Sequence, residues 1–164
     1  MTGWWTAKVR RFVRYFVGRV DSGERKQLAT WLTAAQLALF DEMHRADQRH
    51  GLDVVAALRA DSQTDPDLLL AGLLHDCGKG RDLHVWHRVG WSLGERYGRR
   101  VEHLLMRLPG FTPAFAVIAA HAERSAELAL AAGCSTQTAE LIRYQADPID
   151  DELGRALLIA DQAN

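Results

Sequence analysis

Four ionisable side chains occupy positions at which the sequence otherwise places apolar residues: His50, His75, Asp76 and Asp161. An unpaired carboxylate in a protein interior costs several kcal/mol or takes up a proton, so buried groups of this kind need partners. The most economical partner for two imidazoles and two carboxylates is one bound cation. Nitrogen and oxygen ligands without a thiolate suit Mn²⁺, Fe²⁺, Co²⁺ or Zn²⁺. We therefore predict a site for one such divalent ion per chain.

The sequence around each of these residues is what predicts their burial. The first histidine shares one helical face with Val54 and Leu58, which follow it at intervals of four residues. The His-Asp pair follows a leucine-rich run, Leu68–Leu74, that lacks β-branched residues and so favours a buried helix. The last aspartate closes the apolar run 157–160.

Hydrolysis is the chemistry expected of such a site. A divalent ion with open coordination positions lowers the pKa of a bound water, and phosphoester hydrolysis is the natural use of this effect. Asp76 is a candidate general acid because it lies beside the metal. Lys79, one helical turn beyond His75-Asp76, is either a cation that neutralises a substrate phosphate or a solvated loop lysine.

Helical periodicity and capping residues characterise the rest of the sequence. Helix starts are predicted at Thr33, Asp65, Thr112, Ser135 or Thr136, and Asp150. The first has a capping box with Gln36, and the second and third are each followed by proline. Asp21-Ser22-Gly23 is predicted to end the first helix, and no sustained alternation indicates a strand. We expect an all-α fold of about eight or nine helices.

The first 20 residues carry five basic side chains and no acidic one. Because the whole chain has a net charge of −1, the other 144 residues carry −6. Val9, Phe12, Val13 and Phe16 recur at helical spacing, which predicts an amphipathic helix. Its aromatic face either packs on the domain, which we favour, or attaches the chain to an acidic protein or a membrane surface.

Composition limits the class of protein. A chain of 164 residues with 48% apolar and 25% charged residues describes one soluble globular domain whose core needs no disulfides. The two cysteines lack CxxC spacing, which excludes a zinc ribbon and favours a reducing compartment. No apolar run approaches the length of a membrane span. We expect a cytoplasmic protein without a dedicated nucleic-acid-binding surface.

Three segments resemble the HD-domain superfamily of metal-dependent phosphohydrolases, whose pattern is H…HD…D on an all-α core. They are the stretch His50–Val54, which resembles the first-histidine helix, the block Ala71–Lys79 with its His-Asp-Cys-Gly-Lys end, and the segment Leu157–Asp161. The resemblance covers about residues 45–164 and leaves 1–44 as an N-terminal helical extension. It implies the same four metal ligands that the residue chemistry indicates, and a phosphate-binding role for the lysine.

Branches of this superfamily that bind two metals add histidines from two later segments. His121 resembles the first of these histidines, but Gln145 stands at the position of the second. An amide is a poor ligand beside imidazole, so we expect one metal. His121 then has two open roles: contact with a substrate or second metal, or a helix cap. His84, His87 and Arg88 either face the cleft or line a solvated surface.

These observations predict a metal-dependent phosphohydrolase that hydrolyses a small phosphate ester, such as a nucleotide, by metal-activated water. Two substrate classes of the superfamily are disfavoured. The Gly-Tyr-Pro signature of cyclic-dinucleotide phosphodiesterases is missing, and so is the acidic pair of guanosine-tetraphosphate hydrolases. The alternative is a non-catalytic, metal-bound HD module for ligand sensing or protein interaction, which Gln145 supports.

Overall fold

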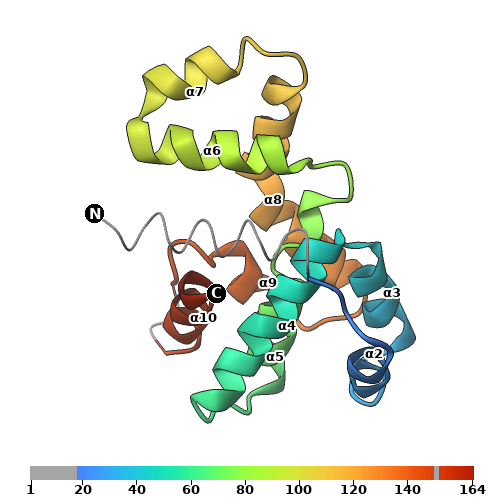
Figure 1. The fold of residues 1–164 in the computed structure, drawn as a ribbon. Coiled ribbons are helices and arrows are strands. Elements are labelled where there is room, and N and C mark those ends of the chain that lie inside the picture. Colours follow the sequence, from blue (N-terminus) through green and yellow to red (C-terminus); the bar gives the residue numbers. More distant parts are fainter. Residues whose placement is uncertain (1–17, 150–151) are drawn as a thin grey trace.

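The computed structural model describes residues 18–149 and 152–164, and these ranges contain helices and no strand (Figure 1). The nine α-helices described are α2 (Ser22–Leu28), α3 (Ala34–Glu42), α4 (Arg45–Ala60), α5 (Pro66–Leu74), α6 (Val85–Tyr97), α7 (Arg99–Leu105), α8 (Phe111–Ala131), α9 (Thr136–Arg143) and α10 (Leu153–Ala163), and a 3₁₀ turn, η1, spans Cys77–Lys79. The all-α prediction is confirmed. None of these helices is long and apolar enough to cross a bilayer. The amphipathic helix predicted in the first 20 residues and the helix start at Asp150 lie outside the described residues, apart from residues 18–20.

Several helices begin where local capping chemistry predicts. Thr33 and Gln36 form a reciprocal capping box at the start of α3. Asp65 caps α5 through its side chain and Pro66 occupies the first turn, as its fixed φ favours. The Ser135 hydroxyl accepts a backbone N–H at the start of α9. These contacts are local, which is why the sequence alone indicates them.

One predicted boundary is wrong, and one helix is missing from the prediction. Residues 18–21 are not helical, but Ser22 and Gly23, expected in the break after the first helix, begin α2, because the Asp21 carboxylate and Glu24 form a capping box there. Helix α8 begins before Thr112, since Gly110 adopts a φ of 82° and turns the chain there. The Thr112 hydroxyl donates instead to the carbonyl of Met106, at 2.9 Å, and caps nothing in α8.

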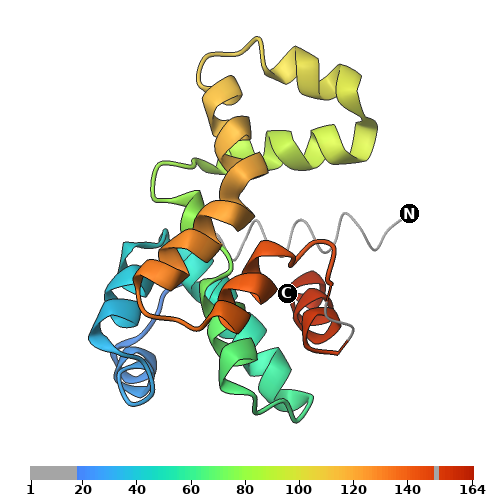
Figure 2. The same ribbon diagram turned by 180° about the vertical axis from the view of Figure 1, so that it is seen from behind.

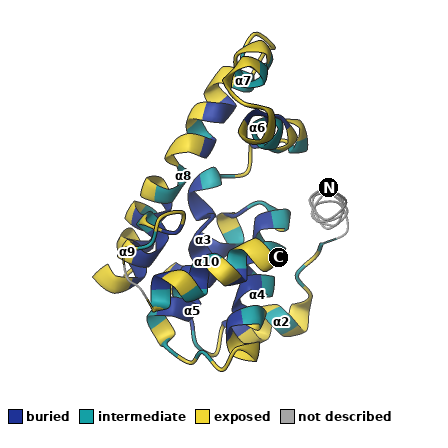
Figure 3. Ribbon diagram, turned by 90° about the vertical axis from the view of Figure 1, so that its left-hand side faces the viewer, coloured by how far each residue is buried: buried dark blue, intermediate teal, exposed yellow. Residues whose placement is uncertain are grey.

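The main hydrophobic core lies between α4, α5, α9, α10 and the C-terminal half of α8, where the buried segments of Figure 3 meet. Leu28 at the end of α2 and Phe40 of α3 belong to this same core, with 2% and 1% of their surface exposed. The described part of segment 1–44 therefore packs on the helices of segment 45–164. The boundary at residue 44 stays a prediction.

Helices α6 and α7 form a hairpin that extends away from the main core (Figures 1 and 2). A second, smaller cluster fills the space between this hairpin and the N-terminal half of α8. Its buried members are Leu83, Ala114, Phe115 and Ile118, with Trp91 and Phe111 packed against them. Helix α8 thus connects the two clusters along its length, and its C-terminal half passes beside η1.

Close approach of α4 and α5 brings two of the predicted ligands together. A Cβ on Gly51 would clash with the backbone carbonyl oxygen of Leu73, and one on Gly72 would lie 2.9 Å from Leu58 Cδ1. His50 directly precedes the first of these glycines, and His75 lies three residues after the second. The imidazole rings consequently meet edge to face, with centroids 5.1 Å apart.

Candidate metal centre

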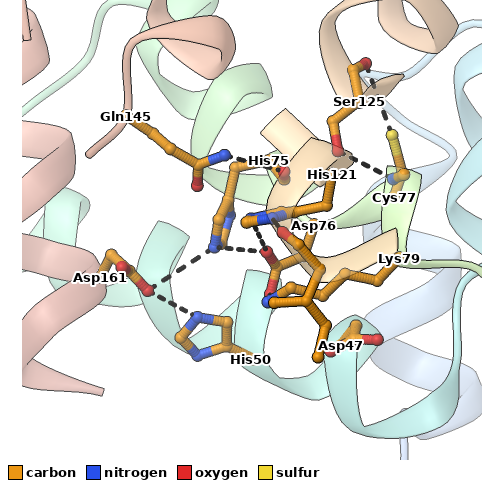
Figure 4. Close-up of polar contacts among 12 residues, drawn as sticks. Asp47, His50, His75, Asp76, Cys77, Lys79, His121, Ser125, Gln145 and Asp161 are labelled. Atoms are coloured by element: carbon orange, nitrogen blue, oxygen red, sulfur yellow. Dashed lines mark hydrogen bonds and ion pairs between the residues drawn. The ribbon is translucent and has the colours of Figure 1, made fainter. Parts of the chain in front are cut away.

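The four predicted ligands converge from α4, the C-terminal end of α5 and α10 (Figure 4). One ligand atom each of His50, His75 and Asp76 lie within 4.8 Å of one another, so this group could hold a metal ion. Asp161 Oδ1 lies 2.8 Å from His50 Nε2 and 3.6 Å from His75 Nε2. The structure therefore places all four predicted side chains around one point.

The orientation of His75 is fixed by a hydrogen bond behind the ring. Its Nδ1 donates to the carbonyl of Gly72 at 3.0 Å, which turns Nε2 toward Asp76 and Asp161. That Nε2 atom is buried and has no hydrogen-bond partner among the described residues. Metal-binding histidines are commonly held in this way, with the second nitrogen bonded to a carbonyl. An orphaned nitrogen facing two carboxylates fits a bound cation.

The charges at the centre are strongly coupled. Burial lowers the pKa of His75, but the carboxylates of Asp76 and Asp161 outweigh it and raise that pKa to about 9. Burial raises the pKa of the Asp76 carboxyl, but Lys79 and His75 hold it well below its usual range. The hydrogen bond from His50 and the close approach of His75 likewise overcome burial and lower the pKa of Asp161. Both carboxylates are therefore ionised, and without a metal the proton on His75 supplies the positive charge between them.

Metal affinity is expected to rise with pH up to about 9, because a metal must displace the proton from His75. Affinity should fall about tenfold for each pH unit below that pKa. The same proton stabilises the metal-free fold below pH 6.5, and this stabilisation is lost as pH rises through about 9. Titration calorimetry in buffers of different ionisation enthalpy measures the proton release. An affinity that is unchanged over this range would contradict the expectation.

Lys79 lies against the centre. Its Nζ is 2.6 Å from Asp76 Oδ2, and 19% of its side chain is exposed. Lys79 is therefore not a fully solvated loop residue, and its role in binding phosphate stays a prediction. The ammonium group sits at the boundary between the buried carboxylate and solvent, where it can contact a bound anion.

His121 also joins the centre, from the middle of α8. Its Nε2 lies 3.5 Å from Asp76 Oδ1, and its Nδ1 donates to the Ile118 carbonyl at 2.5 Å. Burial and the nearby Lys79 lower the pKa of His121, which favours the neutral imidazole. A residue in the interior of a 21-residue helix does not cap it, so the helix-cap alternative is wrong. His121 offers a neutral nitrogen at the edge of the site.

Gln145 reaches the same region from the segment after α9. Its side-chain amide donates to the backbone carbonyl of His75 at 3.3 Å, and 9% of the residue is exposed. The amide nitrogen is thus engaged in holding the His-Asp turn against α9. A single metal stays a prediction.

Two supporting contacts have no simple signal in the sequence. Arg88 of α6 forms a bidentate ion pair with the buried Asp47 carboxylate, with both N···O distances at 2.6 Å. Asp47 lies one turn before His50, and this spacing is the one indication that both residues share a face. On the other side of the site, Ser125 Oγ accepts the Gly78 N–H at 2.8 Å and ties η1 to α8.

The histidines that begin α6 lie apart from this centre. His84 is exposed, and the ring of His87 packs edge-on against Phe111, with centroids 5.1 Å apart. Arg88, by contrast, does not line a solvated surface, since it pairs with the buried Asp47 carboxylate. Its role is to fasten the α6–α7 hairpin to α4.

No family model, no curated protein and no solved structure matches this chain. The likeness to the HD-domain superfamily therefore rests on the sequence pattern, and the case for function rests on the arrangement of side chains.

Proposed function

We propose that the protein is a metal-dependent phosphohydrolase of the HD-domain type that acts on small phosphate esters, such as a nucleotide. The observation that carries the proposal is the convergence of His50, Asp76 and Asp161 on a buried His75 nitrogen that lacks a hydrogen bond. One Mn²⁺, Fe²⁺, Co²⁺ or Zn²⁺ per chain suits these ligands, and when bound it would activate water and polarise a phosphate oxygen.

The remaining side chains of the centre are suited to different tasks. Asp76 is held ionised by its neighbours, so it serves better as a ligand than as a proton donor. Lys79 places a positive charge where a phosphate would enter, 2.6 Å from Asp76 Oδ2. His121 presents Nε2 with a free electron pair, because its Nδ1–H is bound to Ile118. That nitrogen can accept a proton or a substrate hydroxyl.

Lys79→Gln is expected to lower kcat/KM for phosphate esters by about 100-fold, since a charge-assisted contact to phosphate is worth roughly 2–3 kcal/mol. Metal content should stay at the wild-type level. Phosphate release from p-nitrophenyl phosphate and a panel of nucleoside monophosphates, with Mn²⁺ present, is the measurement. Lys26→Gln, an exposed lysine of α2, is the matched control. Full activity in the Lys79 variant would contradict its assigned role.

A second candidate function has a specific observation in its favour. Gln145 directs its amide nitrogen to the His75 carbonyl, where a two-metal enzyme would have another imidazole ligand. A metal-bound module that senses a nucleotide or binds a protein would need no second ligand set. Phosphate release and nucleotide binding distinguish the two candidates. The enzyme releases phosphate from the panel of phosphate esters, whereas the sensor binds a nucleotide without turnover.

A further inference from the structure

The α6–α7 hairpin concentrates the exposed apolar side chains of the described chain. Nine large hydrophobic residues are exposed in the described ranges, and five of them lie between residues 85 and 108: Trp86, Val89, Tyr97, Leu104 and Leu108. Trp86 and Leu104 are 65% and 63% exposed. The hairpin stands at the end of the molecule far from the main core (Figure 3), so this surface is available to a partner.

One face of this hairpin is also basic. A hollow on the surface of α7 is lined by Arg99, Arg100, His103, Leu104 and Arg107. These positions recur at intervals of about four residues along α7 and the turn that follows it, and Leu108 comes directly after the last of them. None of the three arginines forms an ion pair with any residue in the described ranges, whereas Arg25, Arg49 and Arg143 pair with carboxylates. The acidic residue of α7, Glu102, packs toward Gly94 of α6 and leaves this face positive.

We propose that this face of α7 docks the protein on an anionic membrane surface. Arginines near a membrane are attracted to anionic headgroups, and their aliphatic stems lie along the apolar boundary. Leu104 and Leu108, four residues apart on either side of Arg107, would insert into that boundary, and Tyr97 at the hairpin turn is of the type enriched there. The surface therefore offers charge and apolar area together.

Other occupants fit this face less well. A second copy of the chain would bring two sets of unpaired arginines into contact, which like-charge repulsion opposes. A nucleic acid would satisfy the arginines but would leave Leu104 and Leu108 against a polar backbone. The proposal does not depend on the phosphohydrolase function, because the hairpin surface is separate from the four ligands and would serve a hydrolase or a sensor.

Cosedimentation of the full chain with vesicles tests the proposal. We expect binding to vesicles of phosphatidylcholine with phosphatidylglycerol, none to phosphatidylcholine alone, and weaker binding as salt is raised. Changing Arg99, Arg100 and Arg107 together to Gln should lower the partition coefficient about 100-fold. Leu104→Ser with Leu108→Ser should lower it about tenfold or more at unchanged charge.

Two control variants of the full chain separate this surface from other basic residues. Lys26, Arg45 and Arg124 changed together to Gln remove the same charge from exposed positions elsewhere and should leave binding within a few-fold of wild type. A second variant changes Lys8, Arg10, Arg11 and Arg14 to Gln. The proposal is overturned if either control loses as much binding as the α7 arginine variant, if the leucine variant binds like wild type, or if wild type binds an oligonucleotide but not the anionic vesicles.

Discussion

Asp76→Asn is expected to abolish stable metal binding and to lower phosphate-ester hydrolysis at least about a thousand-fold. Asp76 is 4% exposed, and its Oδ1 lies 3.7 Å from His75 Nε2 and 3.5 Å from His121 Nε2. The amide keeps the shape of the side chain but removes the negative charge that holds a cation there. The charge stabilisation that a metal supplies is worth several kcal/mol, which sets the size of the effect.

Asp53→Asn is the matched control for this experiment. Asp53 lies on α4, one turn beyond His50, and pairs with Arg49 at 3.0 Å. The substitution removes the same charge from a neighbouring position on a ligand-bearing helix, at a carboxylate that pairs with Arg49 and is not among the four predicted ligands. Metal content by elemental analysis and hydrolysis in Mn²⁺ are measured for both variants. Retention of the metal by the Asp76 variant would contradict the assigned ligand set.

Gly78→Ala is expected to destabilise the metal-free fold by about 3 kcal/mol, which corresponds to a decrease in Tm of roughly 6–12 °C. An added Cβ would lie 2.5 Å from the His121 carbonyl oxygen and 2.7 Å from the Ser125 backbone nitrogen. Both atoms belong to the backbone of α8, so neither can rotate away. The resulting shift of η1 against α8 should also weaken metal binding, because η1 directly follows Asp76.

Gly94→Ala supplies the comparison for a buried glycine with more room. Its nearest neighbour would be Glu102 Cβ at 3.3 Å, a side-chain atom, and alanine favours the helix by about 1 kcal/mol. We expect little net change in Tm. The Tm of both variants is measured by thermal unfolding followed by circular dichroism. A Gly78→Ala variant with the Tm of the wild type would show that η1 and α8 do not pack as closely as described.

The candidate ligands could be predicted from the sequence because burial and chemistry conflict at those positions. A histidine on the face of Val54 and Leu58, and an aspartate that closes an apolar run, are costly without a partner. The meeting of these side chains then depends on close helix packing, which Gly51 and Gly72 permit. Patterns of this kind predict the site because few helix packings give every buried ionisable side chain a partner.

Contacts between distant segments could not be predicted in the same way. The Asp47–Arg88 pair joins residues 41 positions apart, and the sequence around either residue does not indicate which partner it has. The start of α8 differs from the prediction for another reason. Thr112-Pro113 has a good N-cap pattern, but Gly110 turns the chain two residues earlier, and the Thr112 hydroxyl donates to the Met106 carbonyl. The role of Gln145 likewise depends on where the chain after α9 lies, which spacing does not reveal.

The proposed metal centre is tested by the metal content of the full chain, purified without chelator and measured by elemental mass spectrometry. We expect one equivalent of Mn, Fe, Co or Zn per wild-type chain and close to none in Asp76→Asn. Two equivalents would mean that His121 completes a second site despite Gln145. A wild-type chain that holds no metal, even after incubation with each of these four ions, would show that the four side chains do not form a metal centre.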